Sequence, residues 1–217
     1  MRCHCFEERR ITMETEAKEY VFLPTTCVSD AQNGLKNMHT NIKPLLEEYK
    51  ICGPAHTVSV HANDNLAVLK GIRTAKPGDI LVVDAKGHDY NCQVGDFVVG
   101  MAKVLGVAGI VMDGHIRDVV GVKAVELPVF CTGTTVAAGG KAGVGEVGGT
   151  IACGGVAVNE GDIIVGDADG VVVVPADKAK DVFALAAEKE SKDAERAARI
   201  LQDADSVRRH LDQVLGL

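Results

Sequence analysis

Two pairs of residues have the types and spacing needed to handle an anion and a cation together. Gly95-Asp96 stands at the expected start of one helix, and Arg117-Asp118 follows the next buried strand along the chain. The guanidinium of Arg117 is a planar fork that matches carboxylate or enolate oxygens. The carboxylate of Asp118 is a hard oxygen ligand, of the kind that holds Mg²⁺ or Mn²⁺ while water or substrate fills the other positions. The pairs therefore indicate chemistry on a small carboxylate beside a divalent cation.

Both pairs are expected at the carboxyl ends of parallel strands. The segments 79–84 and 106–112 are apolar enough for buried strands, and 96–105 has the pattern of a helix. In an open α/β sheet, ligands collect at the carboxyl ends of the strands, where the unpaired N–H groups of helix N-termini attract anions. Spacing alone leaves a second interpretation open, in which Asp118 merely caps a helix and Arg117 is its exposed neighbour.

The remaining elements alternate between helix and strand patterns and then become rich in glycine. Before the pairs, the sequence predicts a short helix from Ser29-Asp30 to about Met38, a helical segment at 45–49, a strand at 55–61 and a helix from 64 to about 76. After them it predicts a strand at 128–131, a second, antiparallel sheet from segments at 151–152, 156–158, 163–165 and 171–174, and a long helix from 176 toward 215. This order predicts an α/β fold with a largely parallel sheet.

Composition excludes several classes of function. The 217 residues suit one domain, which we place at 13–217 after a disordered N-terminal extension at 1–12. A net charge of -7 without a basic run argues against direct nucleic-acid binding. No apolar run approaches the roughly 18 residues that span a membrane. Seven cysteines, an odd number at irregular spacings, favour reduced thiols and a cytoplasmic location.

Two glycine motifs do not support nucleotide binding. The run Gly143-Val144-Gly145-Glu146-Val147-Gly148 matches G-x-G-x-x-G, but no helical pattern follows it, as the dinucleotide fingerprint requires. Gly140-Lys141 resembles part of a P-loop, yet Ala142 stands where a Ser or Thr must bind magnesium. These glycines are therefore interpreted as turn residues.

Motifs spread over most of the chain carry a family resemblance. They are Gly53-Pro54-Ala55-His56-Thr57-Val58, Asp64-Asn65, Pro77-Gly78-Asp79, Gly95-Asp96, Asp113-Gly114, Arg117-Asp118, Pro128-Val129-Phe130, Gly154-Gly155-Val156, Gly161-Asp162 and Asp167-Ala168-Asp169-Gly170-Val171. The most specific is Asp96, followed after twenty residues by Arg117-Asp118. The chain resembles the RraA-like family, which includes class II 4-hydroxy-4-methyl-2-oxoglutarate / 4-carboxy-4-hydroxy-2-oxoadipate aldolases and regulators of ribonuclease E activity.

The resemblance implies a role for each residue of the two pairs. The pyruvyl part of a small 2-oxo acid substrate would bind to Arg117 and to the backbone amides of Gly95-Asp96-Phe97-Val98. Asp118 would hold the divalent metal, Mg²⁺ or Mn²⁺. Asp96 would orient a water molecule or relay a proton. The chain departs from the family at Gly121, where the aldolases usually have Glu or Asp, and this departure bears on which aldol substrate is used.

The resemblance also implies a fold, an assembly and two kinds of function. The expected fold is a layered β/β/α sandwich of the swivelling-domain type with a long C-terminal helix, forming trimers or hexamers with the active site between subunits. Glu190 of that helix is the candidate for a carboxylate that reaches a neighbour's metal-bound waters. The implied activity is metal-dependent cleavage of a 4-hydroxy-2-oxo acid to pyruvate and a second oxo acid, with oxaloacetate decarboxylation. The alternative is a protein-binding regulator without turnover.

Overall fold

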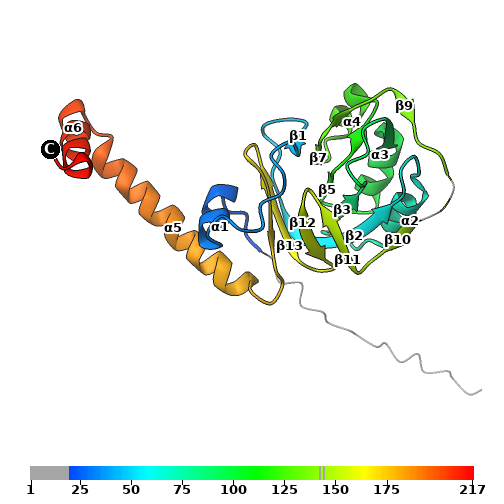
Figure 1. Cartoon of the computed structure of the whole chain (residues 1–217), viewed down its shortest axis with the longest axis horizontal. Coiled ribbons are helices and arrows are strands. Elements are labelled where there is room, and N and C mark those ends of the chain that lie inside the picture. Colours follow the sequence, from blue (N-terminus) through cyan, green and yellow to red (C-terminus); the bar gives the residue numbers. More distant parts are fainter. Residues whose placement is uncertain (1–19, 142, 144) are drawn as a thin grey trace, which may run out of the picture.

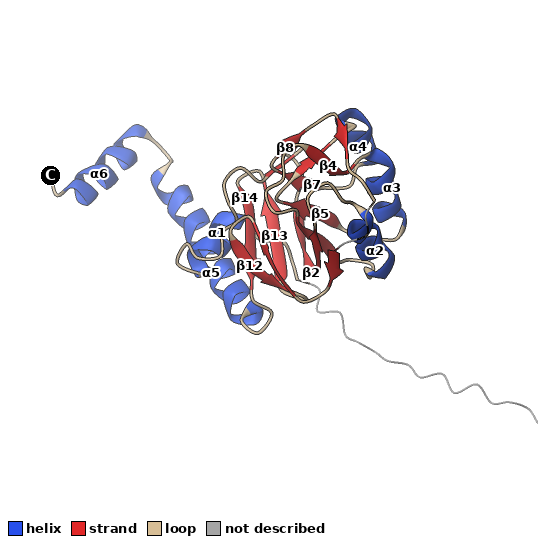
Figure 2. Ribbon diagram, turned by 45° about the vertical axis from the view of Figure 1, so that its right-hand side comes forward, coloured by secondary structure: helices blue, strands red, loops and turns tan. Residues whose placement is uncertain are grey.

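The structure, a computed structural model, describes residues 20–141, 143 and 145–217. The predicted N-terminal extension at 1–12 lies outside these residues. Helices, a large sheet and a layer of further strands form the body of the chain, from which a helical arm projects (Figures 1 and 2). The predicted layered α/β architecture with a long C-terminal helix is confirmed.

A sheet of eight strands forms the middle layer. In spatial order it contains β1 (Lys43–Pro44), β7 (Val129–Cys131), β5 (Gly109–Met112), β3 (Ile80–Asp84), β2 (Ile51–Val60), β13 (Ile163–Asp167) and β14 (Gly170–Val174), with β10 (Gly145–Val147) also paired to β2. The central strands β7, β5, β3 and β2 are parallel. Every residue of β3 and β5 is buried, as expected for parallel strands that are covered on both faces.

Both faces of this sheet are covered. The helices on one face are α2 (Leu66–Thr74), α3 (Asp96–Val104) and α4 (Val119–Val125). Their buried Val68, Val99 and Val122 join Leu81 and Ile110 of the sheet in one apolar cluster. The opposite face packs against a hairpin of β11 (Thr150–Cys153) and β12 (Val156–Asn159), in a second cluster. Burial of these two apolar faces fixes the order of the layers.

A small sheet carries the connections that follow the central strands. It contains β8 (Gly133–Thr134), β6 (His115–Ile116), β4 (Asn91–Val94) and β9 (Ala137–Ala138), and all its pairs are parallel. Strand β4 follows β3 along the chain, and β6 follows β5. The small sheet therefore begins where the parallel strands of the large sheet end.

Two predicted helices near the N-terminus are wrong. Helix α1 spans Thr25–Ala31, and no helix runs from Ser29 to Met38. The start of α1 is fixed by Asp167, whose carboxylate accepts hydrogen bonds from the Thr25 amide (2.9 Å) and hydroxyl (2.6 Å). The segment 45–49 is not helical either, because the Leu45 amide donates to the Val129 carbonyl at the edge of the sheet (3.0 Å).

The C-terminal half differs from expectation in two respects. Strands β13 and β14 do not form a separate antiparallel sheet with β11 and β12, because β13 pairs with β2 and extends the large sheet. The predicted helix 176–215 is divided into α5 (Ala179–Ile200) and α6 (Ala204–Leu215), since Asp203 caps the Ser206 amide (2.7 Å) and starts a new helix. None of the helices in the described part of the chain is long and apolar enough to cross a membrane.

The carboxylate of Glu160 supports β2 near the start of its parallel pairing with β3. Glu160 accepts hydrogen bonds from the Thr57 amide (2.8 Å) and hydroxyl (3.0 Å), and its other oxygen lies 2.7 Å from Nδ1 of His56. Burial raises the pKa of Glu160, but these hydrogen bonds outweigh burial and leave the pKa below its ordinary value of 4.5. The carboxylate form is therefore favoured by folding.

Glu160→Gln is expected to make stability less dependent on pH at the acidic end. Because the folded-state pKa of Glu160 is lowered, its contribution is present above the pKa of the unfolded chain and is lost as pH falls through the folded-state value. Urea unfolding at about pH 7 and about pH 4 should show a smaller loss for the variant than for the natural chain. Glu195→Gln, which removes an exposed carboxylate of α5, is the control. An equal loss in both variants would contradict the assignment.

Candidate active site

The small sheet brings the two predicted pairs together. Strand β4 ends one residue before Gly95, and β6 ends one residue before Arg117. The two strands are paired in parallel, and the Arg117 amide donates to the Val94 carbonyl (3.1 Å). Because both turns leave neighbouring strands at the same edge, Gly95-Asp96 and Arg117-Asp118 line one cavity, as predicted.

The two turns approach each other closely at Gly95. A Cβ on Gly95 would lie 2.6 Å from Oδ2 of Asp118 and 3.4 Å from Cγ of Arg117. The first of these distances is shorter than real side chains allow, and the second is ordinary contact. Gly95 itself has an extended backbone (φ -131°, ψ -174°), so no torsion angle requires glycine, and a Cβ here would make the free end of the Asp118 side chain rotate away.

Asp118 does not act as a helix cap. It stands immediately before α4 in the left-handed region (φ 57°, ψ 40°), and its side chain makes no capping hydrogen bond. Instead, Oδ2 accepts a hydrogen bond from Nε of Arg117 (3.1 Å), and both side chains are about two-fifths exposed. The left-handed region is uncommon for a non-glycine residue, and aspartate tolerates it better than most. The carboxylate therefore remains available to a ligand in the cavity.

The cavity also contains residues that the sequence analysis did not assign to the site. Its volume is about 320 Å³, and its lining consists of Asn65, Cys92, Gly95, Asp96, Phe97, Val98, Arg117, Asp118, Ala138, Gly139 and Lys141. Lys141 adds a second cation. Oδ1 of Asn65 is buried without a hydrogen-bond partner among the residues that the structure describes. Asn65 and Lys141 come from distant parts of the chain, which the Asp64–Gly140 bridge and the β4–β9 pairing bring together. Local sequence spacing therefore does not predict their place in the cavity.

The first turn of α3 presents backbone amides to this cavity. Its first intrahelical hydrogen bond runs from the Val99 amide to the Gly95 carbonyl (3.0 Å), so the preceding amides have no partner within the helix. The Phe97 amide donates to Oδ1 of Asp96 (2.6 Å). The amides of Asp96 and Val98 have no acceptor within the described part of the chain. Of the four predicted substrate-binding amides, those of Asp96 and Val98 are thus free within the described residues, and that of Phe97 is held by Asp96.

The donor set fits a hard divalent cation. Nowhere in residues 20–141, 143 and 145–217 do three or more His, Cys, Asp or Glu side chains gather closely enough to hold a metal ion together. The acidic residues that line the polar cavity are Asp118 and Asp96. Mg²⁺ commonly binds through one or two carboxylates while retaining several waters, and the hard oxygen ligand suits Mn²⁺ as well.

Glu190 is not part of this cavity within one chain. It is exposed on α5, which packs against α1 beside β14, whereas the cavity lies among the connections from β4, β6 and β9 (Figure 1). The ion pair between Lys189 and Asp30 (3.3 Å) marks the same contact of α5 with α1. The role predicted for Glu190 therefore depends on a neighbouring copy of the chain.

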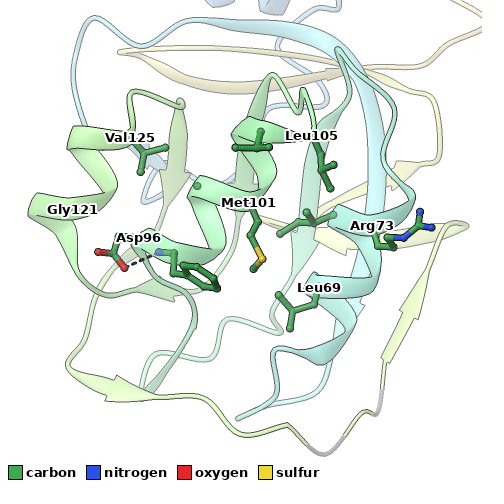
Figure 3. Close-up of a pocket in the computed structure, with 11 residues that line it drawn as sticks. Leu69, Arg73, Asp96, Met101, Leu105, Gly121 and Val125 are labelled. Carbon is green, nitrogen blue, oxygen red and sulfur yellow. Dashed lines mark hydrogen bonds between the residues drawn. The ribbon is translucent and has the colours of Figure 1, made fainter.

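A larger apolar groove adjoins the cavity. Its volume is about 820 Å³, and it runs between α2, α3 and α4, as Figure 3 shows. Leu69, Met101 and Val125 lie along it, and Asp96 and Phe97 border both the groove and the polar cavity. The polar cavity and the apolar groove thus meet at the start of α3.

Comparison with known sequences identifies relatives over most of the chain. Residues 25–173 match the RraA-like family, described as Aldolase/RraA. A protein of Halalkalibacterium halodurans, named "Putative 4-hydroxy-4-methyl-2-oxoglutarate aldolase", is 48% identical over 193 residues, which are 89% of this chain and 92% of the relative.

Solved structures show the same fold. RraAS2 of Streptomyces coelicolor, described as an unusual member of the RNase ES inhibitor RraA family, is 33% identical with a TM-score of 0.71, over 83% of this chain and 94% of its own. The RNA-processing inhibitor RraA from Thermus thermophilis is 26% identical with a TM-score of 0.66, over 71% and 94%. The similar proteins thus include one named as an enzyme and others described as inhibitors.

Proposed function

The chain belongs to the RraA-like family, and on that premise we propose that it is a divalent-metal-dependent class II aldolase. It cleaves a 4-hydroxy-2-oxo dicarboxylic or tricarboxylic acid to pyruvate and a second oxo acid, and it decarboxylates oxaloacetate. The observation that carries this proposal is the convergence of Arg117, Asp118 and the free amides of α3 on one cavity. The name of the relative that is 48% identical supports the same activity.

The residues of the cavity have complementary roles in such a reaction. Both cleavage of the aldol and decarboxylation leave the enolate of pyruvate, so negative charge develops on the 2-oxo oxygen. The guanidinium of Arg117 stabilises that oxygen, while the amides at the start of α3 bind the adjacent carboxylate. Asp118 holds the metal, which supplies Lewis-acid polarisation of the 2-oxo group when bound. Asp96, at the border of the cavity, orients a water molecule or relays a proton.

Lys141 supports a substrate with more than one carboxylate. Its position in the lining of the cavity gives the site a second cation besides Arg117. One carboxylate can bind at the start of α3 and another near Lys141, which suits a dicarboxylic or tricarboxylic acid better than a monocarboxylic one.

Five cysteines in the described residues are unpaired, in keeping with our proposal that the protein acts in the cytoplasm.

The direct test is release of pyruvate from a panel of 4-hydroxy-2-oxo acids and oxaloacetate, with Mg²⁺ or Mn²⁺ and with EDTA. We expect release that EDTA abolishes and added metal restores. Release that is unaffected by EDTA would contradict the metal dependence, and the absence of release from every acid would contradict the enzyme.

A protein-binding regulator without turnover is the second candidate. It is favoured by the fold shared with two proteins described as inhibitors of RNA processing or of RNase ES. The open cavity with Arg117 and Asp118 favours the enzyme instead. Capture of a ribonuclease by the purified protein, together with no metal-dependent pyruvate release, would reverse this preference.

We also expect a homotrimer or a hexamer. Phe97 and Val104, which line the apolar groove, are 76% and 86% exposed, and Leu211, Val214 and Leu215 of α6 are about half exposed or more. Apolar surface on this scale commonly marks an interface, and closed rotational symmetry would cover it with copies of the same chain. Light scattering at micromolar concentration should give three or six times the 22.8 kDa of one chain. A monomeric mass would contradict the assembly.

A further inference from the structure

The two turns of the site are fitted together by a pair of glycines. A Cβ on Gly95 would meet the carboxylate of Asp118, as described above. Reciprocally, a Cβ on Gly121 in α4 would lie 2.5 Å from Oδ2, 2.8 Å from Cβ and 3.0 Å from Cγ of Asp96. Asp118 thus lies against Gly95, which precedes α3, and Asp96 lies against Gly121, which is part of α4. Figure 3 shows the Asp96 side chain beside the helix that carries Gly121.

Glycine at position 121 is otherwise unfavourable. The residue lies inside α4, where glycine is less favourable than alanine because its backbone loses more conformational freedom on folding. Its φ angle is not in the left-handed region, so the backbone conformation does not require glycine. The contact with Asp96 is the physical reason that remains.

Rotation of the Asp96 side chain cannot relieve this contact fully. Oδ2 and Cγ of Asp96 can swing away, but its Cβ, 2.8 Å from the added atom, is fixed to the backbone of α3. With α3 and α4 packed as closely as they are in this chain, a methyl group at position 121 has to push the first turn of α3 away from α4. That turn carries the amides and the Asp96 carboxylate, whereas Arg117 and Asp118 immediately precede α4.

We propose that Gly121 is a positioning residue, which sets the distance between the anion-binding turn 95–98 and the Arg117-Asp118 pair. This inference rests on the proposed function for its effect on substrate. The contact itself can be tested independently of any activity. The residues of α4 make no polar contact with substrate in the proposed reaction. Through Gly121, however, the position of α4 affects the geometry of the cavity.

Gly121→Ala is expected to raise the KM for oxaloacetate and to lower kcat/KM by about 10- to 100-fold, in line with the effect of a displacement of about 1 Å in a site. A merely structural role would lower the amount of folded protein without changing the KM of what remains. Gly100→Ala is the matched control: Gly100 also lies within a helix, but a Cβ there meets nothing within 4 Å. The control should keep the natural KM.

A double-mutant cycle in urea tests the contact without substrate. Gly121→Ala should lower the unfolding midpoint of the natural chain but not that of an Asp96→Gly variant, which lacks all three contacting atoms. If Gly121→Ala does not fold, recovery of folded protein in the double variant reports the same coupling. Equal losses in both backgrounds, an unfolded double variant, or an unchanged KM would overturn the proposal. Coupling in urea without pyruvate release in the natural chain would instead refute the aldolase alone.

Discussion

Asp118→Asn is expected to abolish pyruvate release at ordinary Mg²⁺ concentrations. Asparagine keeps the size of the side chain and tolerates the left-handed conformation of residue 118, but it removes the charge that would hold the cation. Loss of a group that only supports a metal ligand costs about 10- to 100-fold, so loss of the ligand charge should cost more. The measurement is oxaloacetate decarboxylation as a function of metal concentration, where high Mn²⁺ should restore part of the activity.

The control for Asp118→Asn lies at the other end of the same helix. Glu126 follows α4 in nearly the same left-handed conformation (φ 57°, ψ 35°), is exposed and lies outside the cavity. Glu126→Asn therefore introduces the same residue into the same backbone geometry and should leave activity unchanged. Near-normal, EDTA-sensitive activity in Asp118→Asn would show that the metal is held elsewhere.

Arg117→Ala is expected to reduce turnover by about two to three orders of magnitude, the effect of removing one donor that stabilises a developing oxyanion. The metal requirement should not change, since Asp118 keeps its carboxylate. The pairing of β6 with β4 should also remain, because the backbone amide of residue 117 still donates to the Val94 carbonyl. Kinetics over a range of Mg²⁺ concentrations should therefore show a lower maximum with the same half-saturating concentration.

Arg117→Lys separates charge from shape in the same experiment. Lysine supplies a cation without the planar fork, so we expect activity between that of Arg117→Ala and that of the natural chain. Circular dichroism and the urea midpoint serve as controls for folding. If Arg117→Ala unfolds the protein, the ion pair with Asp118 is a structural contact and the catalytic assignment is wrong.

The sequence was most informative where local signals and function coincide. Asp96 and Arg117-Asp118 each follow a strand, and the general location of ligands in α/β sheets was enough to predict that they face one cavity. The central strands β3 and β5 were predicted to within a few residues, because a continuous apolar run has few alternatives in a layered fold. The chemical roles of these residues remain predictions.

Long-range contacts account for what the sequence did not predict. The start of α1 depends on a carboxylate 142 residues away, in Asp167, which no local helix signal contains. In the sequence, Lys141 stands out only beside Gly140 in an incomplete P-loop pattern, whereas the pairing of β9 with β4 brings it to the cavity. Gly121 was visible as a departure from the family, but its contact with Asp96 required the packing of α3 on α4.

Because of the small sheet β8-β6-β4-β9, the residues of the site can change without changing the residues that stabilise the fold. Most buried apolar residues belong to the large sheet and its covering layers, whereas the cavity residues stand mainly on connections from β4, β6 and β9. Exposed connections of this kind accept substitutions at little cost in folding free energy. Descendants of one ancestor can therefore exchange substrates, or lose turnover and keep only a binding surface, on an unchanged scaffold. Such drift would explain why an aldolase name and inhibitor names occur among proteins similar to this chain.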